Sequence, residues 1–322
     1  MSQNGIIGAE RIIPAMRNPA QYIVMFTIFI FIPVAAIYFL PLLLSTGDYQ
    51  AFQDPQSPLN PFIYFAMILG MTLLMLVLIK YAKEKIMRAI FYTAMLLSMF
   101  SILLPIFYYL INNVDISLIL AVASAVGLMA WLILRPEWYV INSVAVLIGV
   151  GATAILGISL GILPALILLS ILAVYDAISV YKTKHMLSLA EGVTKMRLPV
   201  LFYVPKKLDF KVEQMDSMDL KDRDKDQDRE TMIMGVGDAV IPGILIVSVM
   251  AYLETNSLHF QHADVLVTAG TLIGACCGFA VLMKYVATGR PQAGLPLLNG
   301  GAILGFLITY LLVFQDLNFG FL

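Results

Sequence analysis

Charged residues are scarce in this chain. Asp, Glu, Lys and Arg make up 13% of the 322 residues, whereas 60% are hydrophobic; an average soluble domain carries about 25% charged residues. The mean hydropathy is +0.88. This composition excludes an ordinary soluble domain, so we interpret the chain as an integral membrane protein and expect no nucleic-acid partner.

Cysteine and histidine are also rare, and their positions disfavour two kinds of chemistry. The two cysteines, Cys276 and Cys277, are adjacent in an apolar stretch, where they cannot form an ordinary disulfide and are typical of small packing residues. The three histidines, His185, His259 and His262, fall in predicted loops without a His-Glu-x-x-His sequence, which disfavours a metalloprotease. We expect neither a metal nor a cofactor.

The lack of histidine in the apolar stretches also bears on Ser159. Residues 157–161 match the Gly-x-Ser-x-Gly pattern of serine hydrolases. A serine nucleophile needs a base, usually histidine, within hydrogen-bond reach. We therefore interpret Ser159 as part of a short turn between two spans.

Apolar stretches long enough to cross a bilayer about 30 Å thick are abundant. The first contains a hydrophobic run of about 23 residues, too long for the core of a cleaved signal peptide, and is predicted to be a retained anchor. The predicted fold class is an all-α membrane protein with nine transmembrane helices. The predicted spans are residues 22–44, 61–79, 89–111, 116–134, 139–158, 162–181, 232–253, 264–287 and 295–314.

Basic residues are missing from every second connection between these spans. If the N-terminus is placed inside, all 20 Lys and Arg residues fall in inside segments, and the outside loops have none. The positive-inside rule therefore predicts a cytoplasmic N-terminus and an extracytoplasmic C-terminus.

One long polar segment divides the chain into residues 1–181, a cytoplasmic loop at 182–231, and residues 232–322. Within the loop, residues 222–230 mix both charge signs without an aromatic residue, which is typical of a flexible, solvated tether. Residues 198–205 are apolar and bounded by prolines. Two interpretations of them stay open: a re-entrant or surface-lying piece, or an extended strand at the mouth of a site, able to pair with an unwound substrate.

Two acidic residues, Asp176 and Asp238, lie well inside predicted spans. A carboxylate in lipid costs several kcal/mol, so each is a functional-site hypothesis. With the orientation above, Asp176 lies about 8 Å and Asp238 about 9 Å from the cytoplasmic face, at 1.5 Å per helical residue. The matching depth predicts one shared site.

Weakened helix segments are predicted at the same depth. Gly235 and Gly237 remove side chains just before Asp238, Pro242 follows it, and the last span opens on residues 295–301 with a proline and two glycines. Such segments let another backbone come close. Other glycines, at four-residue spacing in the last two spans, are typical of close helix packing; they are Gly270, Gly274, Gly278, Gly301 and Gly305.

The aspartates alone leave alternatives open. One is two unrelated polar residues that face a water-filled groove or bond between helices. Another is the proton or cation site of a secondary transporter built from broken helices. The predicted depth lies nearer one face than the midplane, and the sequence shows no internal repeat, so we give the transporter a lower weight.

Three short motifs resemble the signatures of one family. Tyr-Asp at residues 175–176, Gly-x-Gly-Asp at 235–238 and Pro-Leu-Leu at 296–298 are similar to those of presenilins and signal peptide peptidases, the intramembrane aspartyl proteases. Gly-x-Gly-Asp alone also occurs in prepilin peptidases, a further alternative, but the set of three is specific. The motif order, the number of spans and the long loop resemble the nine-helix fold of this family, and the short tails resemble its archaeal members.

The resemblance implies that Asp176 and Asp238 are catalytic. One ionised carboxylate takes a proton from a water that attacks the scissile carbonyl, and the protonated one donates to the carbonyl oxygen. The implied substrates are transmembrane helices of other proteins, which must unwind to expose a carbonyl. The implied site-shaping residues are Tyr175, Gly235, Val236, Gly237, Pro296, Leu297 and Leu298.

The resemblance also bears on location, partners and local variation. It implies the cell membrane of an archaeon and no obligatory partner subunit, while a homo-oligomer stays open. Two residues depart from the family pattern: Leu297 replaces the Ala of a Pro-Ala-Leu triplet, and Asn299 stands where presenilins have a further Pro. Both departures concern the edge where a substrate would dock.

Overall fold

The computed structural model describes residues 19–46, 49–81, 84–180, 200–206, 231–257, 260–286 and 293–316. Within these ranges the chain forms nine helices and one antiparallel sheet of two strands. The helices are α1 (Pro19–Thr46), α2 (Asn60–Tyr81), α3 (Glu84–Ile111), α4 (Val114–Leu134), α5 (Trp138–Ser159), α6 (Ile162–Ile178), α8 (Val236–Tyr252), α9 (Ala263–Val286) and α10 (Leu295–Phe314). The strands are β1 (Leu201–Pro205) and β2 (Thr231–Gly235). The charged run at 222–230 lies outside the described residues.

Each predicted span coincides largely with one helix. Six helices of the described part, α1, α3, α4, α5, α9 and α10, are long and apolar enough to cross a membrane. The helices α6 and α8 have 17 residues each, or about 26 Å at 1.5 Å per residue, slightly less than a bilayer core of about 30 Å. The two helices that carry the aspartates are therefore among the short ones.

The predicted span at 232–253 is wrong at its start. Residues 231–235 form β2, and α8 begins only at Val236. β2 pairs with β1 so that Gly235 lies opposite Leu201. A short apolar run such as Met-Ile-Met suits a strand as well as a helix, and the partner strand decides between them. Asp238 consequently lies in the first turn of α8, not deeper in a longer helix.

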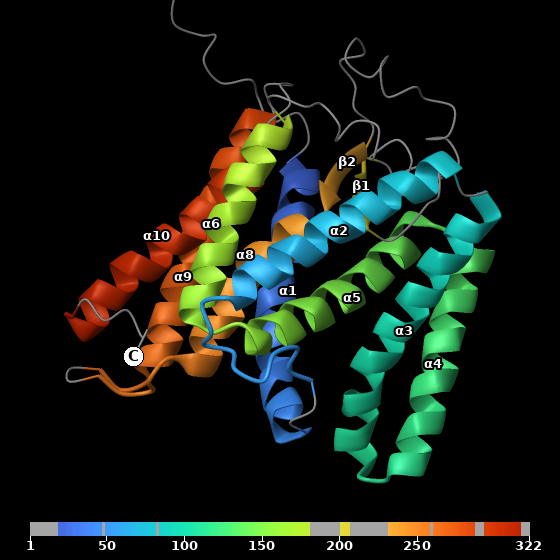
Figure 1. The fold of residues 1–322 in the computed structure, drawn as a ribbon, viewed down its shortest axis with the longest axis horizontal. Coiled ribbons are helices and arrows are strands. Elements are labelled where there is room, and N and C mark those ends of the chain that lie inside the picture. Colours follow the sequence, from blue (N-terminus) through green and yellow to red (C-terminus); the bar gives the residue numbers. More distant parts are fainter. Residues whose placement is uncertain are drawn as a thin grey trace, which may run out of the picture.

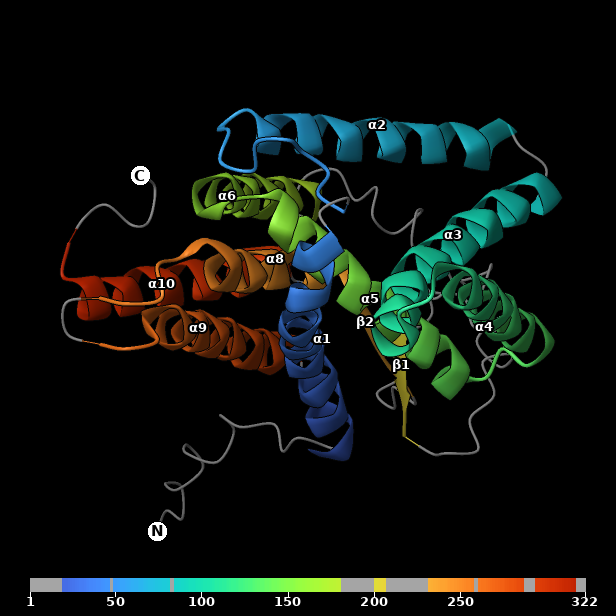
Figure 2. The ribbon, with the colours of Figure 1, turned by 90° about the horizontal axis from the view of Figure 1, so that it is seen from below.

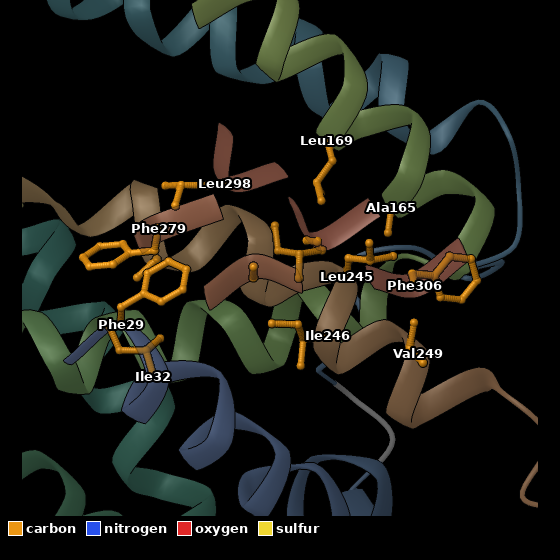
Figure 3. Close-up of a cluster of buried hydrophobic side chains, with 14 of the residues drawn as sticks. Phe29, Ile32, Ala165, Leu169, Leu245, Ile246, Val249, Phe279, Leu298 and Phe306 are labelled. Atoms are coloured by element: carbon orange, nitrogen blue, oxygen red, sulfur yellow. The ribbon is translucent and has the colours of Figure 1, made fainter. Parts of the chain in front are cut away.

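The bundle is packed around α8. α3 and α4 form a pair on one side of the molecule, and α9 and α10 lie on the other (Figures 1 and 2). α8 is buried along most of its length, and side chains of α1, α6, α9 and α10 pack around it (Figure 3). α2 and α4 instead expose many large apolar side chains, as expected for helices that face lipid.

The helices α9 and α10 approach each other through their glycines. A Cβ atom added to Gly274 would lie 2.2 Å from the carbonyl oxygen of Gly301, and one added to Gly278 would lie 2.2 Å from that of Leu297. Side chains at these positions would enter the neighbouring backbone. The predicted close packing is confirmed, and it fixes the start of α10 against α9.

The turn between α5 and α6 is closed by polar bonds. The Ser159 hydroxyl donates to a carbonyl of its own helix at 2.6 Å and accepts from the Ala51 N–H at 2.8 Å. The Ser248 hydroxyl of α8 donates at 2.7 Å to the carbonyl of Leu160, an extended residue at the end of α5. Ser159 is the last residue of α5, so the predicted turn begins one residue later, and its hydroxyl binds the connection between α1 and α2 at Ala51.

Candidate active site

Asp176 lies near the end of α6 and is 5% exposed. Its Oδ2 atom accepts a hydrogen bond from the Leu295 main-chain N–H, with 3.1 Å between nitrogen and oxygen. The N–H of Gly294 donates to the same carboxylate. Both donors belong to the start of α10, where the first N–H groups have no partner inside the helix. The side chain of Asp176 therefore caps α10.

Asp238 is the third residue of α8 and is partly buried. Its carboxylate accepts a hydrogen bond from the main-chain N–H of Gly235, the residue just before the helix. This backward bond from the third position is the one found in capping boxes. The Asp238 carbonyl lacks its usual helical donor, because Pro242 stands four residues later and has no N–H. Asp238 thus occupies a loosened helix start.

The two carboxylates meet at Gly294. A Cβ atom added there would lie 3.9 Å from both Cγ and Oδ1 of Asp238, while the N–H of the same glycine donates to Asp176. The carboxylates are close enough to interact electrostatically. The structure therefore brings together the ends of three segments: the end of α6 and the starts of α8 and α10.

Two helix N-termini point at this pair, that of α10 at Asp176 and that of α8 at Asp238. Each N-terminus carries a partial positive charge of about half a unit and stabilises a nearby anion. Two full negative charges at one buried place oppose each other. The arrangement favours a single charge shared by two carboxyl groups, so that one group can accept a proton while the other donates one.

The residues of the third motif form the first turn of α10. Pro296 is the second residue of the helix, where a missing N–H costs little because no helical acceptor exists for it. Leu298 is fully buried, whereas Leu297 is only partly buried. The carbonyl of Leu297 lies against Gly278 of α9. This motif therefore supports Leu295, the residue that binds Asp176.

The Gly-x-Gly-Asp motif at residues 235–238 leaves space beside Asp238. A Cβ atom on Gly235 would lie 3.3 Å from Oδ2 of Asp238, so glycine lets the carboxylate fold back. Gly237 is exposed, and a Cβ atom there would meet only Ile241, at 4.0 Å. The Val236 N–H donates at 3.0 Å to the carbonyl of residue 200, at the start of β1. The motif thus joins the sheet to α8 and leaves the outer side of Gly237 open.

Tyr175 lies apart from the carboxylates, because neighbouring residues of a helix face different directions. The side chain is 37% exposed. Its ring meets Phe65 of α2 edge-on, with 5.7 Å between ring centroids. The two rings belong to an apolar groove of about 410 Å³ between α2 and α6, which is also lined by Ser170, Ile171, Val174 and Ile178. Of the predicted site residues, Tyr175 shapes this groove and not the surroundings of the carboxylates.

Two amide side chains that the sequence did not single out hold β1 beside the site. Asn142 of α5 donates to the Tyr203 carbonyl at 2.8 Å and accepts from the Tyr203 N–H at 2.9 Å. Gln21 of α1 donates to the Val204 carbonyl at 2.8 Å. Residues 201–205 form the predicted strand, but β1 has partners on both edges, so its outer edge at Tyr203 is not open to the predicted pairing with a substrate. An amide inside a predicted span was the signal that could have identified Asn142, whereas Gln21 precedes the first predicted span and gave no such signal.

Comparisons with known proteins agree with one another. Residues 26–315 match the family model "Signal-peptide peptidase, presenilin aspartyl protease". A structure of a presenilin family intramembrane aspartate protease in space group C222 is 34% identical, with a TM-score of 0.67 over 91% of this chain and 99% of that one. A second, in space group P2, is 33% identical, with a TM-score of 0.66 over 94% and 99%. The comparison with curated protein sequences finds no match.

Proposed function

Because the chain belongs to the signal-peptide peptidase and presenilin family of intramembrane aspartyl proteases, we propose that Asp176 and Asp238 are its catalytic pair. Membership of this family decides between the protease and the transporter, in favour of the protease. The assignment of the two residues rests on their meeting at Gly294 under two helix N-termini. This shared position is the observation that supports the proposal most strongly.

The pair performs general acid and base catalysis on water. The ionised carboxylate takes a proton from a water, whose oxygen attacks the scissile carbonyl, and the protonated carboxyl group donates to the carbonyl oxygen. The pair holds one proton before and after this step, so the two groups titrate as a unit. The donors at Gly235, Gly294 and Leu295 hold both side chains in place during the exchange.

We propose that the substrate is a transmembrane helix that unwinds and pairs with β2. The Val236 N–H bonds to β1. Alternate residues of a strand bond to opposite edges. The N–H and carbonyl of Ile233 therefore point away from β1, and no described residue bonds to them. Substrate peptides with single N-methylated amides near the cleaved bond would test this pairing: we expect slower cleavage at alternate positions, and equal rates at every position would contradict it.

We propose that the N-terminus faces the cytoplasm of an archaeal cell and the C-terminus faces outward. The distribution of all 20 basic residues supports this orientation. Reporter domains fused at the C-terminus should appear outside and those inserted between residues 207 and 230 inside. A cytoplasmic C-terminal reporter would contradict the orientation.

The catalytic assignment is tested by Asp176→Asn and Asp238→Asn in purified protein with a transmembrane peptide substrate. We expect each variant to fold and to lose cleavage, measured as new peptide termini by mass spectrometry, because both an acid and a base are needed. Asp264→Asn is the matched control, since Asp264 is also buried but lies in the first turn of α9. Cleavage at the parental rate by either site variant would overturn the assignment.

A further inference from the structure

Asn299 is a polar residue on the buried face of α10. Its side chain is 0% exposed, and its neighbours on the same face, Leu298, Ala302 and Phe306, are apolar. The Nδ2 atom donates to the main-chain carbonyl of Leu169 on α6, at 2.9 Å. The Oδ1 atom has no hydrogen-bond partner among the described residues. A buried amide whose oxygen has no hydrogen-bond partner is unfavourable for stability, so stability does not account for Asn299 at this position.

The Asn299 bond lies on the same helix contact as the bond to Asp176. Asn299 follows Leu295 by four residues and therefore lies on the same face of α10, one turn further along. Leu169 precedes Asp176 by seven residues, two turns back on the same face of α6. Besides the Gly294 N–H bond to Asp176, the contact between α6 and α10 thus carries a bond from the Leu295 N–H to Asp176 and one from Asn299 to the Leu169 carbonyl.

These two bonds differ in what they require. The Leu295 bond ends on a carboxylate that exchanges protons during the proposed reaction, so its strength changes with the state of the pair. The Asn299 bond joins two neutral groups and does not depend on protonation. On the other side of α10, the glycine contacts with α9 allow a close approach but supply no directional bond from a side chain. The Asn299 bond is therefore a directional side-chain contact between α10 and α6 that does not involve the carboxylates.

We propose that Asn299 is a positioning residue for proteolysis: its bond to the Leu169 carbonyl holds the first turn of α10 where the Leu295 N–H meets Asp176. The proposal rests on the catalytic assignment of Asp176 and Asp238. Since Asn299 acts through the geometry of the pair, its loss should lower kcat more than it changes KM.

The test compares Asn299→Leu, Asn299→Gln and Ser248→Ala in purified protein, with kcat, KM and thermal unfolding measured for each. Asn299→Leu keeps a similar volume and removes the amide; we expect kcat to fall about 10- to 100-fold while KM stays within about threefold. Asn299→Gln retains an amide and should recover part of the loss in kcat. Ser248→Ala is the matched control, because it removes another buried side-chain bond to a carbonyl, far from the pair, and should leave kcat unchanged.

A second variant covers the case in which Asn299→Leu does not fold. The hydroxyl of Asn299→Ser can bond to its own helix, so the bond to α6 is lost while a small polar group remains, and the same fall in kcat is expected. Parental kcat in Asn299→Leu or Asn299→Ser, or no recovery in Asn299→Gln, would overturn the positioning role. These outcomes leave the catalytic assignment intact, whereas activity in Asp176→Asn or Asp238→Asn would overturn that assignment itself.

Discussion

The two ends of the core formed by α5, α6 and α8 hold their polar groups in opposite ways. At the site end, main-chain N–H groups of Gly235, Gly294 and Leu295 donate to the two carboxylates. At the opposite end, the side-chain hydroxyls of Ser248 and Tyr252 donate to main-chain carbonyls at the turn between α5 and α6. One end holds acids in place with backbone donors, and the other closes a backbone turn with neutral side chains.

The two ends therefore have different tasks: the site end holds groups that can react, and the opposite end closes a backbone turn. The carboxylates at the site end can change their protonation state and remain hydrogen-bonded, which is what an acid and base pair needs. The hydroxyls at the opposite end only satisfy carbonyls that would otherwise lack a donor. Variants at the site end should therefore change kcat, and variants at the opposite end should change the free energy of unfolding.

The largest effect is expected from breaking the support of the site end. A Cβ atom at Gly301 would lie 2.3 Å from the Gly274 carbonyl oxygen, whereas one at Gly300 would meet nothing within 4 Å. We expect Gly301→Val to destabilise the protein by about 3 kcal/mol and to abolish cleavage by displacing α10. Gly300→Val, its neighbour and control, should unfold and cleave almost like the parent. Similar behaviour of the two variants, in thermal unfolding and cleavage assays, would show that the glycine contact does not support the site.

A smaller effect is expected at the opposite end. Ser248→Ala leaves the Leu160 carbonyl without the donor that now binds it, which should lower the free energy of unfolding by about 1–3 kcal/mol. The kcat of the folded variant should match that of the parent. Unfolding in detergent and cleavage of a peptide measure the two quantities separately. A fall in kcat without a loss of stability would remove the distinction between the two ends.

The smallest effect is expected where a side chain borders the site without bonding to it. Leu297 is partly buried, and its replacement by Ala should preserve cleavage within about threefold or modestly broaden the range of substrates. Pro296→Ala should impair cleavage more, because it frees the backbone at the start of α10. Cleavage rates on a panel of transmembrane peptides would compare the two. If neither variant differs from the parent, the Pro-Leu-Leu segment is only a packing element.

The span positions could be predicted because long apolar runs decide where membrane helices form. The apolar run at 295–314 forms α10 with the predicted first and last residues. The start of α8 could not be predicted, because the choice between strand and helix for residues 231–235 depends on β1, which lies in a different part of the sequence. Local periodicity carries no information about such a partner.

The two acidic residues of the site could be predicted from the sequence, whereas the residues that hold them in place could be predicted only in part. A carboxylate inside an apolar span is conspicuous because of its cost. Gly294 is not, since its role depends on lying between Asp176 and Asp238 in three dimensions. Tyr175 shows the reverse: the sequence places it next to Asp176, and the turn of the helix directs it toward Phe65.

The shared position of the two acids is tested most directly by crosslinking Asp176→Cys with Asp238→Cys in membranes, after both native cysteines are replaced by Ala. We expect a short thiol crosslinker to join the pair efficiently, because both side chains lie at Gly294. The pair Asp176→Cys and Ser248→Cys is the control and should stay unjoined, since these residues lie at opposite ends of the core. Failure to join positions 176 and 238 in a folded, inserted protein would contradict the shared catalytic site.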